Sequence, residues 1–244
     1  MLGPVDYVLW MLGAFLPAIV VVCARKGRVF FRYLTLNLYM LASALLTVGR
    51  FVIFWKYGFR SLEYGYFYFY SDAFLTICLY FALMGLYSHV FQEMGVHKYL
   101  RVGALLLLAL TSWFTWQVLV SSSASLMASA SLVSKASRFV VELSRNLYFV
   151  GLVLTYLLWG AVMKLRETRT QVIQLVSALG VYFSAFAANY ALHTLSPGHS
   201  TVWTYLPQVL AMWLPLAWAY TFAGVPEEAR IATARVAATH GSSR

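Results

Sequence analysis

Charged side chains are scarce in this sequence of 244 residues. Asp, Glu, Lys and Arg together make up 11% of it, whereas hydrophobic residues make up 61%. A water-soluble globular domain carries about 25% charged residues, so this composition excludes a soluble domain of the ordinary kind. The apolar surplus indicates a protein whose solvent is lipid, where about 20 apolar residues make one membrane-spanning helix.

Cysteine is nearly absent as well. Cys23 and Cys78 are the two in the chain, and each falls inside an apolar segment. They form neither a disulfide framework nor a paired-cysteine motif, and such buried cysteines usually pack as small hydrophobic residues. The sequence also lacks a P-loop, an HExxH zinc motif and a lysine in its last apolar segment. These absences argue against the common enzyme classes that the motifs mark and against a retinal-binding protein.

Long apolar runs make up most of the chain and predict an all-α fold, a polytopic membrane bundle of about seven transmembrane helices. The predicted spans are Val5–Cys23, Phe30–Trp55, Tyr64–Val90, Val102–Val120, Phe139–Met163, Val172–Leu195 and Val202–Phe222. In this interpretation residues 1–224 form one transmembrane domain. Residues 225–244 form a short basic tail.

The basic residues predict the orientation of the bundle, because Lys and Arg gather in loops that stay in the cytoplasm. The loops on one side, together with the tail, carry twelve of them, and the loops on the other side carry four. This split predicts the N-terminus outside and the C-terminus in the cytoplasm. The net charge of +10 then indicates anionic lipids as partners at the inner face, and not nucleic acid.

Ionisable residues at membrane depth are costly and therefore mark sites. The polar residues within the spans gather in the predicted outer half of the membrane: Arg50, Asp72, Glu142, Arg145, Asn146, Asn189 and His193. Those of the fifth span share one helical face, as do those of the sixth, because residues three or four apart are neighbours on a helix. Two interpretations stay open. The cluster is either an outward-opening pocket for an anion or a quinone-like head group, or a set of charge pairs, Arg50 with Asp72 and Arg145 with Glu142, that fix helix packing. For a pocket, the polar residues should converge in space, with Arg50 near Asp72.

Aromatic residues precede Asp72 in the third span. Tyr66, Tyr68 and Tyr70 alternate with phenylalanines there. Tyrosine prefers the membrane interface, which explains the first part of the segment. The later residues reach below the head groups and predict an aromatic wall for a flat ligand.

Histidine spacing gives little support for a metal or haem site. His89 and Glu93 lie at the inner end of the third span and His97 in the next loop, whereas His193 and His199 lie on the opposite side of the membrane. A transmembrane haem needs two histidines on facing helices at one depth. We therefore predict no metal site and identify no cofactor.

Small residues and prolines predict how the last two spans pack. Gly180, Ser184 and Ala188 recur every four residues, a spacing that lets helices approach closely. Pro207 and Pro215 remove backbone donors and should bend the seventh span. The serine-rich segment at residues 121–137 predicts a linker.

Three segments carry a family resemblance: Tyr66–Asp72 continuing into Tyr80–Leu83, Tyr87–Phe91, and Arg138–Phe149. With them the chain resembles uncharacterised seven-helix bacterial inner-membrane proteins. The resemblance implies a bacterial inner-membrane location and no specific activity. The predicted topology is also similar to that of seven-helix sensory receptors, which is an analogy of topology alone.

Three functions remain open at this point. The first is a non-catalytic membrane protein that senses a small ligand at the outer face or anchors a larger membrane complex. The second is a subunit of an electron-transfer assembly that binds quinone, pigment or haem. The third is a small transporter or proton-linked carrier. The tail is the one obvious output surface, and its shortness favours a membrane protein partner.

Overall fold

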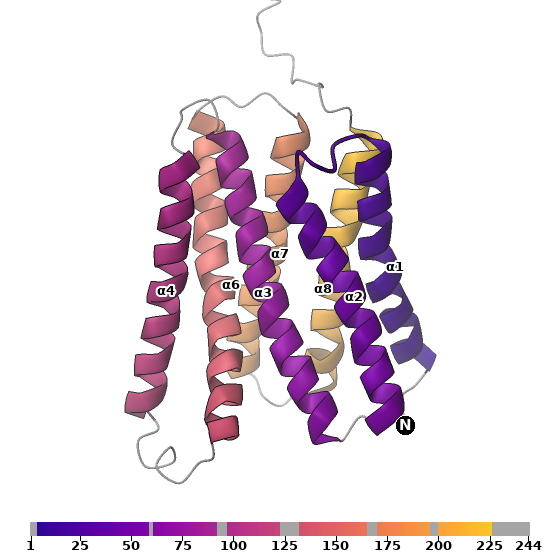
Figure 1. Ribbon diagram of the computed structural model, residues 1–244, viewed down its shortest axis with the longest axis vertical. Coiled ribbons are helices and arrows are strands. Elements are labelled where there is room, and N and C mark those ends of the chain that lie inside the picture. The colour runs from indigo at the N-terminus through magenta and orange to yellow at the C-terminus, as the bar shows by residue number, and fades with distance from the viewer. Residues whose placement is uncertain are drawn as a thin grey trace, which may run out of the picture.

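The computed structural model describes residues 4–58, 61–91, 97–122, 132–164, 170–195 and 200–225, and all regular elements within them are helices. The helices are α1 (Pro4–Lys26), α2 (Leu34–Tyr57), α3 (Leu62–Val90), α4 (His97–Ser122), α6 (Leu132–Lys164), α7 (Thr170–Leu195) and α8 (Ser200–Gly224). They lie side by side in one bundle (Figure 1). The predicted all-helical fold is confirmed, and each predicted span falls on one helix.

Six of the described helices, α1 to α7, are long and apolar enough to cross a membrane. These helices support an integral membrane protein. The last helix, α8, has 25 residues, which is about 38 Å at 1.5 Å per residue. Pro207, Gln208 and Pro215 lower its hydropathy, and its place in the bundle comes from packing on α1 and α7. The seventh span and the orientation of the bundle stay predictions.

The turn between α1 and α2 shortens the second predicted span. The sequence predicts its start at Phe30, but residues 27–33 form turns and α2 begins at Leu34. The side-chain amide of Asn37 donates hydrogen bonds to the carbonyls of Phe30 (3.1 Å) and Tyr33 (3.0 Å). These bonds satisfy carbonyls of the turn and join it to the first turns of α2.

The helix of the fifth predicted span, in contrast, starts earlier in the structure than the sequence predicts. The sequence predicts the fifth span from Phe139, but α6 begins at Leu132 and includes part of the serine-rich segment. Residues 123–131 of that segment lie outside the described residues, as do residues 226–244 of the predicted tail.

Six helices form a closed ring in the order α1, α2, α3, α6, α7 and α8, with α8 again beside α1. Helix α4 packs outside this ring against α3 and α6 and lies at the edge of the bundle (Figure 1). Hydrogen bonds from tyrosine hydroxyls join neighbours across the bundle. Tyr87 of α3 donates to the Leu154 carbonyl of α6 (2.5 Å), and Tyr80 of α3 donates to the Ala104 carbonyl of α4 (2.8 Å).

Large apolar side chains cover the outside of the bundle as well as its core. Trp218, Tyr80 and Phe183 are among the largest fully buried side chains, whereas Leu45 and Trp113 are each 64% exposed. Apolar surface of this kind on the outer faces of long helices suits lipid contact.

The small residues of α7 pack partly against α6. A Cβ on Gly180 would lie 3.4 Å from Cγ2 of Thr155, and the hydroxyls of Ser184 and Tyr156 are 3.3 Å apart. Ala188 is exposed. The predicted close approach is thus found at Gly180 and Ser184, within the chain.

Candidate functional site

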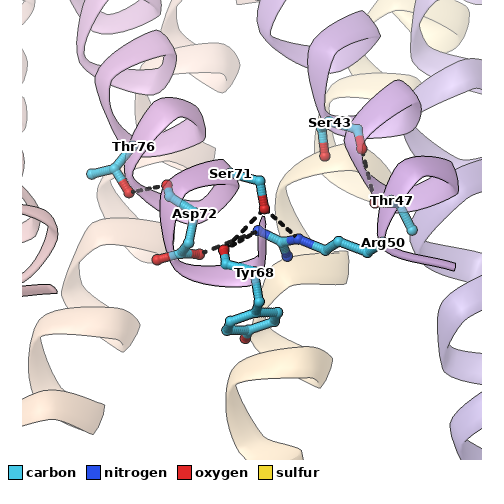
Figure 2. A network of polar contacts seen from close by, with 7 residues as sticks. All are labelled: Ser43, Thr47, Arg50, Tyr68, Ser71, Asp72 and Thr76. Carbon is cyan, nitrogen blue, oxygen red and sulfur yellow. Dashed lines mark hydrogen bonds and ion pairs between the residues drawn. The ribbon is translucent and has the colours of Figure 1, made fainter. Parts of the chain in front are cut away.

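A charged pair joins α2 to α3 inside the bundle. The Nη2 atom of Arg50 lies 3.9 Å from Oδ1 of Asp72. The same guanidinium donates from Nε to the Ser71 hydroxyl (2.7 Å) and from Nη2 to the Tyr68 carbonyl (3.4 Å). Its Cζ atom lies 4.5 Å from the ring centroid of Tyr68. Figure 2 shows the Arg50 side chain reaching from one helix to the other. The expected proximity of Arg50 and Asp72 is therefore confirmed.

Hydroxyl groups around this pair are satisfied within their own helices. Ser71 donates to the Tyr68 carbonyl (2.9 Å), Thr76 donates to the Asp72 carbonyl (2.9 Å), and Thr47 donates to the Ser43 carbonyl (2.8 Å). Such i−3 and i−4 bonds are ordinary for Ser and Thr in helices. Ser71 is buried and is the residue that both accepts from Arg50 and donates to its own helix.

The pair faces a cavity of about 200 Å³ within the helix ring. Its lining comes from all six helices of the ring. The polar part of the lining is Tyr39, Ser43, Thr47, Arg50, Tyr64, Tyr68, Asp72, Tyr148, Tyr182 and Gln208. The remainder is mainly aliphatic, with Trp10, Phe186 and three prolines. Arg50 exposes 18% of its side chain and Asp72 exposes 36%, and because both line the cavity, a ligand there could reach them.

Helical spacing decides which tyrosines of α3 reach this cavity. Tyr64, Tyr68 and Asp72 follow one another at intervals of four residues and all line it. Tyr66 and Tyr70 are 37% and 44% exposed and are not among the lining residues. The reason is the helical period, since residues two apart point to different faces. Of the three tyrosines expected to form the aromatic wall, the structure places Tyr68 beside Asp72.

The polar residues of α6 lie elsewhere. Glu142 and Arg145 form an ion pair with each other, and Asn146 donates to the Thr115 hydroxyl of α4 (2.9 Å). None of these three α6 residues lines the cavity. This placement fits the interpretation that the polar residues of α6 fix helix packing, because the helical face that they share is turned toward α4 and the bundle surface.

The remaining expected residues belong to α7. Asn189 is buried, and its Oδ1 atom accepts no hydrogen bond within the described part of the chain. It does not line the cavity. His193 belongs to the last turn of α7, but its side chain lies outside the described residues. The six predicted residues whose side chains are described therefore do not converge on one site: Arg50 and Asp72 line the cavity, whereas Glu142, Arg145, Asn146 and Asn189 do not.

Seven polar lining residues were not among the predicted site residues: Tyr39, Ser43, Thr47, Tyr64, Tyr148, Tyr182 and Gln208. The ring centroids of Tyr148 and Tyr182 lie 6.3 Å apart, and both residues line the cavity together with Tyr39. The Oε1 atom of Gln208 is buried and accepts no hydrogen bond from any described residue. A signal existed for Gln208, since an amide side chain within an apolar span is itself unusual.

No group of three His, Cys, Asp or Glu residues capable of holding a metal occurs in the described parts of the chain. His89 is buried, and its ring centroid lies 5.1 Å from that of Tyr33. The side chains of Glu93 and His97 lie outside the described residues.

No protein-family model matches the chain, and neither a curated protein nor a solved structure matches it.

Proposed function

We propose that this protein is a non-catalytic membrane receptor that binds a small ligand in the cavity of its six-helix ring. The observation that carries the proposal is the Arg50–Asp72 pair at 3.9 Å, facing a cavity lined by ten polar residues. Charged side chains within membrane spans are rare and usually functional. The pair lies on the lining, and a purely structural pair would be covered by neighbouring side chains.

The volume of the cavity limits the size of the ligand. Drug-sized molecules occupy pockets of about 300–1,000 Å³, whereas this one holds about 200 Å³. The ligand is therefore a metabolite of few atoms. The residues nearest the predicted outer end of the bundle are Leu9, Trp10, Tyr64 and Pro207, so we expect entry between them.

A cysteine-labelling experiment tests whether the cavity opens to water at the predicted outer side. Cys23 and Cys78 are first replaced by alanine, and Thr47→Cys is then introduced on the cavity wall. A matched control is Leu45→Cys on the same helix, where the native side chain is 64% exposed on the apolar outside of the bundle. A membrane-impermeant thiol reagent is added to intact cells and, separately, to inverted vesicles.

The proposal expects rapid labelling of Thr47→Cys from the outer side and slow labelling of Leu45→Cys, because a thiolate does not form in lipid. Equal and slow labelling of both variants would refute a ligand cavity open to water. Labelling of Thr47→Cys from the cytoplasmic side alone would refute entry from outside.

A carrier is the second candidate function. Helices α1–α3 and α6–α8 are two groups of three consecutive helices, and both groups begin at the same end of the bundle (Figure 1). Many carriers have two such groups around a central site. A carrier must open to both sides, so labelling of Thr47→Cys from both sides would favour it over the receptor.

We also propose a membrane protein partner in the bacterial inner membrane, which would receive the signal. Gentle purification from native membranes should then recover a second protein in constant ratio. An absorption band in the same material would instead favour the quinone, pigment or haem alternative.

A further inference from the structure

We propose that the cavity takes a zwitterion of amino-acid size, with the ligand's ammonium group on Asp72 and its carboxylate on Arg50. This inference rests on the proposed function, because it names the class of ligand for the same site.

Charge balance in the cavity is the first argument. Arg50 and Asp72 are its one basic and its one acidic lining residue among the described side chains. Their charges cancel, so the unliganded site is close to neutral. A cation on Asp72 would leave the arginine uncompensated, and an anion on Arg50 would leave the carboxylate uncompensated. A net charge is costly in a low-dielectric interior, whereas a zwitterion preserves neutrality.

Unused hydrogen-bonding capacity is the second argument. At 3.9 Å, the contact between Arg50 and Asp72 is an ion pair without a hydrogen bond. Thr76 bonds to the backbone carbonyl of Asp72, and no described residue donates to its carboxylate. Nε and Nη2 of Arg50 are used by Ser71 and the Tyr68 carbonyl, and no described acceptor contacts Nη1. The carboxylate and Nη1 are therefore free to bind a donor and an acceptor of one ligand.

Further acceptors suit an ammonium group, which has three donors. Oε1 of Gln208 accepts no hydrogen bond from the described residues. Pro17 and Pro215 lack an amide hydrogen, so the carbonyls of Gly13 and Ala211 lose their usual helical donors. All five of these residues line the cavity, on α1 and α8. The wall formed by α1 and α8 thus offers oxygen acceptors, and the wall formed by α2 and α3 carries the charged pair.

The apolar part of the lining accommodates a hydrocarbon body. Met40, Leu75, Leu79 and Phe186 contribute to it. An amino acid with an aliphatic or aromatic side chain combines such a body with both charged groups, and it is smaller than a drug-sized ligand.

The test uses two matched sets of probes on the full chain in lipid nanodiscs, followed by isothermal titration calorimetry. One set is phenylalanine, phenethylamine and 3-phenylpropionate. The other is leucine, 3-methylbutylamine and 4-methylpentanoate. Within each set the hydrocarbon body is nearly constant and the charged groups differ. We expect at least one zwitterion to bind at least about tenfold more tightly than its singly charged counterparts, since each of these lacks one charged group and leaves one side chain of the pair without its charge-assisted hydrogen bond.

Two variants should reverse this preference. Asp72→Asn leaves a net positive site, which should prefer the carboxylate probe, and Arg50→Gln leaves a net negative site, which should prefer the amine. Arg145→Gln is the matched control, because Arg145 pairs with Glu142 outside the cavity, and it should keep the zwitterion preference. If the neutral variants fail to fold, Arg50→Lys and Asp72→Glu are used, which keep the charges but move the charged atoms. They should weaken binding of the zwitterion, and unchanged affinity in both would overturn the inference.

Three outcomes would overturn the inference: no binding of either amino acid, tighter binding of a singly charged probe to the native chain, or an unchanged preference in the charge variants. The labelling of Thr47→Cys separates these results from the receptor proposal. Rapid outer labelling without amino-acid binding would reject the zwitterion and leave the receptor.

Discussion

At Gly151, α6 and α7 approach each other with no side chain from α6 between them. A Cβ added there would lie 2.5 Å from Cζ of Phe183 and closer still to its Cε1, closer than Cβ atoms are normally found to any neighbour. Phe183 is 1% exposed and packs among Tyr148 and Tyr182, so its ring has little room to move. Both tyrosines line the cavity. Packing at Gly151 thus supports the cavity wall as well as the core.

Gly151→Ala should therefore destabilise the protein by about 2 kcal/mol, the usual cost of overpacking a core. Thermal unfolding in detergent measures the change. Gly160→Ala is the control on the same helix, because nothing lies within 4 Å of its added Cβ. It should be neutral or should stabilise α6 by up to about 1 kcal/mol, since alanine favours a helix over glycine. Equal effects of the two substitutions would contradict the packing argument.

Helix α1 ends in a turn that two backbone hydrogen bonds close. After its last turn, the amide of Val29 donates to the Ala24 carbonyl (3.0 Å) and that of Arg28 donates to the Arg25 carbonyl (3.2 Å). Arg28 has φ +58°, the left-handed conformation that usually belongs to glycine at this position. The turn therefore depends on a conformation that is strained for arginine.

Arg28→Gly should raise stability by about 0.5–1 kcal/mol. A left-handed non-glycine residue costs about 1–2 kcal/mol, and relief of this cost is partly offset because glycine gives the unfolded chain more conformational entropy. Arg28→Val should destabilise, since β-branched residues avoid positive φ. Arg28→Asn removes the same charge while tolerating this conformation, and it controls for the lost charge. The unfolding temperature should fall in the order Gly, Asn, Val. Equal unfolding temperatures for the three variants, which all lose the same charge, would contradict the prediction.

The bundle as a whole has two ends, and the basic residues predict which end faces the cytoplasm. The start of α1 and the end of α2 lie at one end, and the α1–α2 turn and the end of α8 lie at the other (Figure 1). Twelve Lys and Arg belong to the predicted inner side. The entry route to the cavity depends on this assignment.

A fluorescent protein fused after residue 244 should fold and fluoresce, because such proteins mature in the bacterial cytoplasm. Alkaline phosphatase fused after Gly58, in the α2–α3 turn, should be active outside. The reverse pattern would show that the bundle is inverted, and ligand entry would then be from the cytoplasm.

The sequence determined the helices and indicated that lipid surrounds them. Apolar runs of about 20 residues leave few alternatives in lipid, where every backbone group needs an internal partner. The helix ends were less predictable, as the turn before Leu34 and the early start at Leu132 show, because capping and local hydrogen bonds decide them. The proximity of Arg50 and Asp72 was also expected, since opposite charges at similar depth on consecutive helices tend to pair.

Which polar residues share a site depends on how the helices pack together. The sequence places Glu142, Arg145 and Asp72 at similar depth, but depth does not state how each helix is rotated about its axis or which helix is its neighbour. Side-chain packing between neighbouring helices decides both. It turned Asp72 toward the cavity with Tyr148 and Tyr182 from distant helices, and it left Arg145 paired with Glu142 outside it.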